Sequence, residues 1–105
     1  MNFKELADQI GLDEEDYREL VDLFLETGQA DYDQLKVSLA DGDAQQVARR
    51  AHTLSGASGN LGLMNVHEIA KRIELAANDG QLDQVSGDVE NLQGLFDEIA
   101  QAVKS

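Results

Sequence analysis

Apolar residues along this chain recur at steps of three and four, the spacing of an α-helix with one buried face. The clearest stretch is at the C-terminal end and comprises Leu82, Val85, Val89, Leu92, Phe96, Ile99 and Val103. The same period runs through residues 3–10, 13–41, 43–61 and 65–78, and it weakens only around residues 27–29. The pattern therefore predicts a short N-terminal helix followed by four longer helices.

Polar residues mark the starts of three of these helices. Asp13 is positioned to cap the N-terminus of the helix that follows it. Asp43 and Asn65 begin capping-box patterns before the next two helices. Because every connection is short, consecutive helices should lie antiparallel. We therefore expect an all-α fold, an antiparallel up-and-down four-helix bundle with a short extra N-terminal helix, in a single domain over residues 1–105.

The composition agrees with a helical, globular chain. There is no proline, 42% of the 105 residues are hydrophobic, and this length suits one core rather than two. No stretch approaches the roughly 20 apolar residues of a membrane span. The first residues lack the basic start and apolar run of a signal peptide. We therefore expect a soluble, cytoplasmic protein.

The formal net charge of −13 argues against nucleic acid as a partner, because phosphate binding depends on clustered Lys and Arg. It also favours a monomer, since surfaces of like charge repel one another. Four of the eight basic residues lie in the two helices at residues 43–61 and 65–78, and these are Arg49, Arg50, Lys71 and Arg72. Positive charge is thus concentrated near one histidine, His52.

His52 lies on the side of its helix opposite to the apolar stripe. At about 100° per residue, five residues share the direction that faces the core. They are Val47, Ala51, Leu54, Ser58 and Leu61. His52 points roughly 140° away from that direction. Its neighbours one and two turns away are Ala48, Arg49, Ser55, Gly56 and Gly59. The imidazole should therefore stand exposed on a strip of small residues.

The two glycines on this strip call for an explanation. Glycine inside a helix costs roughly 0.5–1 kcal/mol relative to alanine. Gly56 and Gly59 both lie on the His52 side, where close approach of another molecule would favour the absence of a side chain. We predict that Ala48, Gly56 and Gly59 form a smooth surface on which a partner protein docks.

The residue inventory excludes most kinds of chemistry for His52. There is no cysteine, and no Ser-His-Asp arrangement can be assembled for acyl transfer. His67 and Glu68 begin like a zinc-protease helix, but Lys71 stands where the second histidine belongs. A phosphate-binding glycine loop is also missing. We therefore predict no metal or cofactor of its own, and a histidine nucleophile that attacks a phosphoryl group brought by another protein.

At these residues the chain resembles the histidine-containing phosphotransfer (HPt) domains of multistep two-component phosphorelays. The family pattern is roughly Ala-His-x-Leu-Lys-Gly, then small residues and Leu-Gly, and this chain has AHTLSG at residues 51–56 and LG at residues 61–62. The KRIE run at residues 71–74 is similar to the next helix of the family. The resemblance implies that His52 accepts a phosphoryl group from a receiver-domain aspartyl phosphate and passes it to another receiver aspartate. Such a domain is a covalent phosphoryl carrier rather than a complete enzyme.

The resemblance also implies the partners, which are the receiver domains of response regulators and a hybrid sensor kinase. Mg²⁺ would then belong to the receiver. Two alternatives stay open: the phospho-accepting domain of a chemotaxis-type histidine kinase, and a bundle that binds receivers without carrying phosphate. The start at Met1 favours a free-standing protein, and the presence of His52 argues against the second alternative.

One residue departs from the family pattern. The family usually has lysine three residues after the histidine, near the phosphoryl group, whereas this chain has Ser55. A hydroxyl donates one hydrogen bond but supplies no charge. We hypothesise that Ser55 contacts the phosphoryl group and that Arg49, one turn before His52, supplies the missing charge.

Two residues of the following helix complete the prediction. If the chain turns near Gly62, His52 lies level with the neighbourhood of Ile73, and Glu74 flanks it. A hydrogen bond from the Nδ1–H of His52 to Glu74 would fix the tautomer and leave Nε2 as the nucleophile. His67 lacks the small neighbours of His52, and we expect it on the surface without a role in phosphate transfer.

Overall fold

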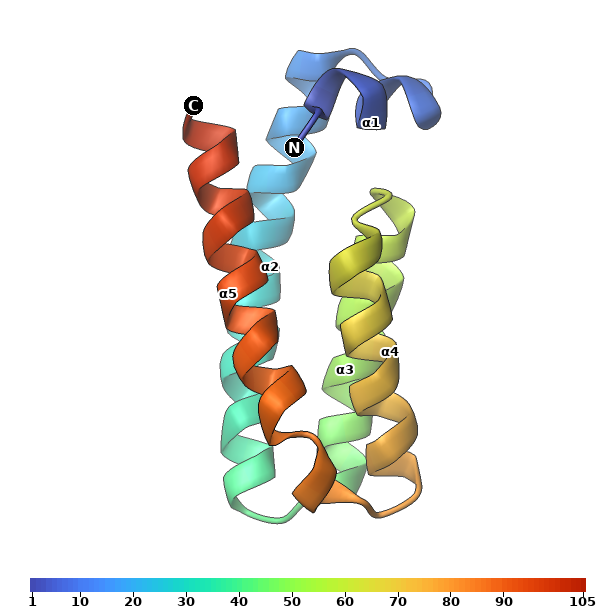
Figure 1. The fold of residues 1–105 in the computed structure, drawn as a ribbon, viewed down its shortest axis with the longest axis vertical. Coiled ribbons are helices and arrows are strands. Elements are labelled where there is room, and N and C mark those ends of the chain that lie inside the picture. The colour runs from blue at the N-terminus through green and yellow to red at the C-terminus, as the bar shows by residue number, and fades with distance from the viewer.

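Five α-helices and one 3₁₀ turn make up the fold in the computed structural model, which describes residues 1–105. They are α1 (Phe3–Gln9), α2 (Glu14–Ala40), α3 (Ala44–Asn60), α4 (Met64–Asn78), η1 (Leu82–Gln84) and α5 (Ser86–Lys104). Figure 1 shows α2 beside α5 and α3 beside α4, with α1 lying across the end of the bundle that holds both termini. The predicted four-helix bundle with a short N-terminal helix is confirmed. None of its helices has the length and apolar character needed to span a membrane.

The core is filled by apolar side chains from every α-helix, and it includes a cluster of aromatic rings. Phe96 of α5 meets Phe24 and Tyr32 of α2 edge to face, with ring centroids 5.8 and 5.7 Å apart. Such pairs contribute about 0.5–1.5 kcal/mol beyond the area they bury. The Tyr32 hydroxyl donates to the Val89 carbonyl at 2.7 Å, so its one polar atom is satisfied in the core. These contacts hold α2 and α5 together.

Tyr17 joins α2 to the far end of α3. Its ring is fully buried, and its hydroxyl donates to the Leu61 carbonyl just after α3 ends. Burial raises the pKa of the Tyr17 hydroxyl above its ordinary value, because the interior disfavours the charged form. The hydroxyl therefore stays a donor, and it satisfies a carbonyl that has no partner within the helix.

The predicted helix starts hold in two places and fail in two. The Asp13 side chain accepts from the Asp16 N–H at 2.8 Å, and Asp43 caps α3 in the same way. Asn65, in contrast, lies inside α4, whose N-cap is Leu63 without a side-chain hydrogen bond. The last helix begins at Ser86 rather than at residue 82, because the first residues of that apolar run form η1.

The weak helical period around residues 27–29 does not interrupt α2. Gly28 is buried in the middle of the helix, where an added Cβ would lie 3.5 Å from Leu54 and 3.6 Å from Phe24 and Phe96. The apolar pattern weakens here because a core position is occupied by a residue without a side chain. One long helix, packed against α3 and α5, thus continues through the stretch where the period weakens.

The Gly28→Ala substitution is expected to stabilise the protein by about 1 kcal/mol, since alanine removes the helix penalty of glycine. The new methyl group would lie at ordinary van der Waals distances from its neighbours. Thermal denaturation followed by circular dichroism measures the change. Gly94→Ala, at an exposed position of α5 with open space around it, is the matched control. A lower Tm in Gly28→Ala alone would show that the α2–α3–α5 contact excludes a methyl group.

Candidate functional site

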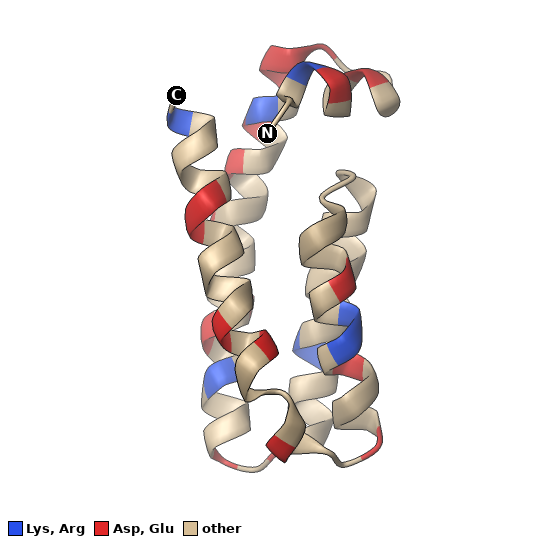
Figure 2. Ribbon diagram, in the orientation of Figure 1, with Lys and Arg blue, Asp and Glu red and all other residues tan.

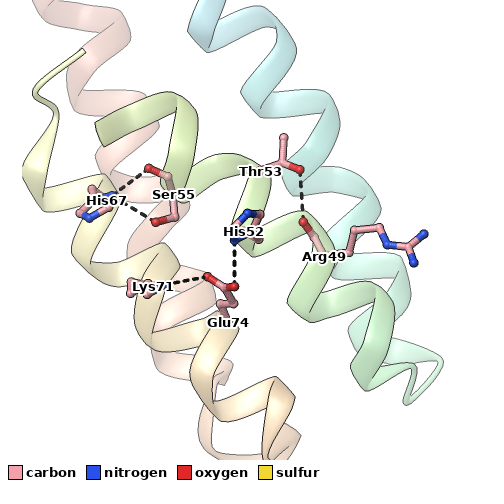
Figure 3. Close-up of polar contacts among 7 residues, drawn as sticks. All are labelled: Arg49, His52, Thr53, Ser55, His67, Lys71 and Glu74. Atoms are coloured by element: carbon pink, nitrogen blue, oxygen red, sulfur yellow. Dashed lines mark hydrogen bonds and ion pairs between the residues drawn. The ribbon is translucent and has the colours of Figure 1, made fainter. Parts of the chain in front are cut away.

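His52 projects from the outer face of α3, as the helical period predicts. Its side chain is 71% exposed, and its Nδ1 lies 2.9 Å from Oε2 of Glu74 on α4 (Figure 3). The predicted contact between these two side chains is therefore present. A carboxylate only accepts hydrogen bonds, so Nδ1 carries the hydrogen and donates it. In the neutral form of the ring, Nε2 is then the nitrogen without a hydrogen, on a side chain that solvent and other proteins can reach.

Glu74 is the fixed member of this pair. Only 13% of its side chain is exposed, compared with 71% for His52 and 49% for Lys71. Its two oxygens have separate partners, because Oε2 accepts from His52 and Oε1 lies 3.5 Å from Nζ of Lys71. A mostly enclosed carboxylate thus connects the exposed imidazole to an exposed ammonium.

The α3–α4 hairpin explains why His52 and Glu74 meet. Gly62 adopts a φ of 73° between the two helices, in the left-handed region that glycine enters without steric cost. The tight turn makes α3 and α4 antiparallel neighbours. Ala51 and Ile73 are fully buried on their facing sides. His52 follows Ala51 in the chain and Glu74 follows Ile73, so both point away from the core. The hairpin places these two residues at the same level of the two helices, where their side chains meet.

Ser55 does not lie on the exposed strip, and that part of the prediction is wrong. It is only 4% exposed and faces α4, where its hydroxyl lies 3.1 Å from Nδ1 of His67. The same Nδ1 donates to the Ser55 carbonyl at 2.8 Å. A position three residues after His52 is rotated by about 60° back around the helix, toward α4. The hydroxyl is therefore engaged with His67 and is not open to a group on His52.

Two of the three predicted docking residues are also placed differently. Ala48 is 7% exposed and belongs to the core. A Cβ at Gly59 would lie 3.0 Å from Nδ1 of His67, so this glycine makes room for a side chain of α4. His67 is accordingly half-buried against α3 rather than free on the surface. Only Gly56 has open space around it, with no atom within 4 Å of an added Cβ.

Two basic side chains of α3 and α4, Arg49 and Lys71, point in different directions. Arg49 is exposed, and its guanidinium points away from His52 (Figure 3). Lys71 was not predicted as a site residue, yet its ammonium lies beside Glu74. The three-residue spacing from Lys71 to Glu74 puts both on one face of α4, which is the sequence signal that could have identified it. No group of three or more His, Cys, Asp or Glu side chains is arranged to hold a metal ion.

Comparison with known proteins gives one family and one similar structure. A family model described as the Hpt domain matches residues 19–103. The crystal structure of histidine-containing phosphotransfer protein B (HptB) from Pseudomonas aeruginosa PAO1 is similar in fold, with a TM-score of 0.84 and 27% sequence identity. The match covers 94% of this chain and 86% of that chain. A search of curated proteins found no match.

Alanine at the two glycines of α3 should have opposite effects on stability. Gly59→Ala is expected to destabilise by about 1–2 kcal/mol, because the methyl group would displace His67 from Ser55. Gly56→Ala should stabilise by about 0.5–1 kcal/mol, since it only removes the helix penalty. Urea denaturation measures both changes. In a His67→Ala background, Gly59→Ala should become stabilising; a loss of stability that persists there would contradict the role assigned to Gly59.

Proposed function

This chain belongs to the Hpt domain family and acts in histidine phosphotransfer in two-component phosphorelays; on that premise we propose that His52 is the residue that carries the phosphoryl group. The observation that supports this assignment is the pairing of an exposed imidazole with a mostly enclosed carboxylate. Nδ1 of His52 is held by Glu74, and Nε2 is left free on the surface. His67 has its Nδ1 directed into the α3–α4 contact and lies partly covered.

The proposed transfer is a direct displacement at phosphorus. The Nε2 lone pair of His52 attacks the phosphorus of an aspartyl phosphate on a receiver domain, the N–P bond forms, and the P–O bond to the aspartate breaks. The leaving group is the aspartate carboxylate. The hydrogen on Nδ1 stays in place, so the imidazole gains positive charge, and the carboxylate of Glu74 offsets it. The reverse reaction delivers the phosphoryl group to the next receiver.

The proposed docking surface surrounds Gly56 and extends onto α2. Gly56 offers clearance one turn from His52 on α3, and α2, which packs against α3, exposes Leu20 and Leu23 to 40% and 55%. Exposed leucines on the helix that packs against α3 fit a partner that binds by burying apolar area and then dissociates. The surface therefore consists of Gly56 with residues of α2, rather than of Ala48 and Gly59.

The remaining parts of the proposal concern the partners and their setting. The partners are receiver domains of response regulators and of a hybrid sensor kinase, and the Mg²⁺ of the reaction is bound by the receiver. The protein acts as a covalent carrier rather than as an enzyme, since the phosphoryl group resides on its own side chain between two transfers. The net charge of −13 supports a monomer. We place it in the cytoplasm together with these partners.

Replacement of the proposed acceptor tests the function directly. A receiver domain phosphorylated with ³²P should transfer label to the wild-type chain, and His52→Ala should receive none. His67→Gln is the matched histidine control and should be labelled. The label should be stable to alkali and labile to acid, as expected of an N–P bond. Label on His52→Ala would refute the assignment, and binding of receivers without labelling of the wild type would favour a receiver-binding bundle.

Glu74 should act on rate rather than on the presence of label. Glu74→Ala is expected to slow transfer by about 10- to 100-fold, the effect of a charge-assisted hydrogen bond worth about 1.5–3 kcal/mol. Glu74→Gln should be intermediate, since its amide oxygen still accepts from Nδ1–H but carries no charge. Rapid-quench kinetics measure the rates, and ¹⁵N NMR of His52 reports the tautomer. Glu68→Ala, which removes an exposed carboxylate from the same helix, is the control. Equal rates in Glu74→Ala and Glu68→Ala would exclude the orienting role.

A further inference from the structure

The carboxylate that holds His52 also contacts a positive charge of α4, because Nζ of Lys71 lies 3.5 Å from Oε1 of Glu74. We propose that Lys71 stabilises the phosphoryl group carried by His52, in the place where Ser55 of α3 offers no charge. This inference rests on the proposed function of His52. It replaces the hypothesis that Arg49 supplies the charge.

A cation is needed here because the phosphoryl group adds negative charge to an already acidic protein. The chain carries a net charge of −13, and a phosphoryl group brings about two further negative charges. Glu74 stands directly behind the imidazole and adds a third negative charge to the neighbourhood. Without a cation within reach, these like charges would raise the free energy of the phosphorylated state.

Basic residues of α3 and α4 gather on one side of the bundle (Figure 2), but most of them are directed elsewhere. Arg50 pairs with Asp31 of α2 at 3.1 Å. Arg72 holds Asp88 of α5 with two hydrogen bonds, at 2.7 and 3.2 Å. Arg49 points away from His52 (Figure 3). The remaining cation of this group is Lys71.

The register of the hairpin places Lys71 level with Ser55. His52 contacts Glu74, and Gly59 packs against His67 two turns along the same two helices. In an antiparallel pair, each step forward along α3 corresponds to a step back along α4. Residue 55, three after His52, therefore lies across from residue 71, three before Glu74. The hydroxyl of Ser55 is held by His67 at that level. The ammonium of Lys71 therefore enters the same part of the site from the opposite helix.

Lys71 is free to change partners. Its Nζ lies 3.5 Å from Oε1 of Glu74, and its side chain is 49% exposed. Exposed ion pairs of this kind are weak, and lysine carries its charge on a long, flexible stem. The ammonium can therefore turn toward a phosphoryl oxygen on Nε2 of His52. Oε2 of Glu74 keeps its hydrogen bond to Nδ1 throughout, because Lys71 is on the other oxygen.

The experiment compares Lys71→Gln with Lys71→Arg and with Lys4→Gln, which removes the same charge from an exposed position on α1. Each variant is phosphorylated by the same ³²P-labelled receiver. Lys71→Gln should be labelled on His52 about three- to tenfold more slowly than the wild type, consistent with loss of a charge-assisted contact at an exposed site. Lys71→Arg and Lys4→Gln should stay close to the wild type.

A ³¹P NMR titration separates charge stabilisation from a structural effect. An ammonium beside the phosphoryl group favours its dianion, so the pKa of the phosphoryl group should be higher in Lys71→Gln than in the wild type. A merely structural role of Lys71 would not move this titration. Lys4→Gln, folded equally by circular dichroism, should titrate as the wild type does.

Three outcomes would overturn the inference, and they can be told apart. Unchanged rate and titration in Lys71→Gln, with His52 still labelled, would refute the role of Lys71 and leave the proposed function standing. A larger effect in Arg49→Gln than in Lys71→Gln would assign the charge to Arg49. Absence of label on the wild-type chain would refute the proposed function as well, which distinguishes it from the first two outcomes.

Discussion

The antiparallel packing of α3 against α4 is the constraint on which the site depends. Gly62 permits a turn of three residues between the helices, and the facing residues Ala51 and Ile73 are fully buried. A slip of one residue in either helix would rotate its outward side chains by about 100°. His52 and Glu74 would then no longer face each other. The chemistry of an exposed imidazole is thus fixed by apolar contacts beneath it.

The same contact between two helices gives the two histidines different environments. His52 stands where α3 leaves open space, and its Nδ1 donates to a carboxylate. His67 lies against Gly59, and its Nδ1 donates to a backbone carbonyl. Both rings have Nδ1 engaged, so the tautomer alone does not separate them. The two histidines differ in exposure and in the charge of the group that accepts from Nδ1. The carboxylate beside His52 offsets positive charge that develops on its ring, whereas the neutral carbonyl beside His67 does so only weakly.

The period of apolar residues predicts the bundle, the outward direction of His52 and the nearness of Glu74, because each follows from helix geometry and one short turn. It misplaces Ser55 and Gly59 for a physical reason. A helical wheel has a single inward direction, whereas α3 in a bundle contacts both α2 and α4. On the flank toward α4, Ser55 is buried and Gly59 packs against His67, although neither belongs to the apolar stripe. The wheel also cannot show that Gly28 is a core position, since glycine has no side chain to mark it.

Glu74 divides the site into a rigid and a mobile part. Its side chain is mostly enclosed, while the side chains of His52 and Lys71 that it contacts are 71% and 49% exposed. Side-chain entropy is therefore lost at the carboxylate when the protein folds, and the imidazole is oriented before a partner arrives. The ammonium of Lys71, in contrast, is held only weakly. A phosphoryl carrier needs both properties. Its nucleophile has to be oriented for attack, which Glu74 provides, and its phosphoryl group has to be released again, which a weakly held cation permits. A rigidly held cation that stabilised the phosphorylated state more than the transition state would raise the barrier to discharge by the difference. An exposed lysine offsets the charge without making the phosphoryl group hard to remove.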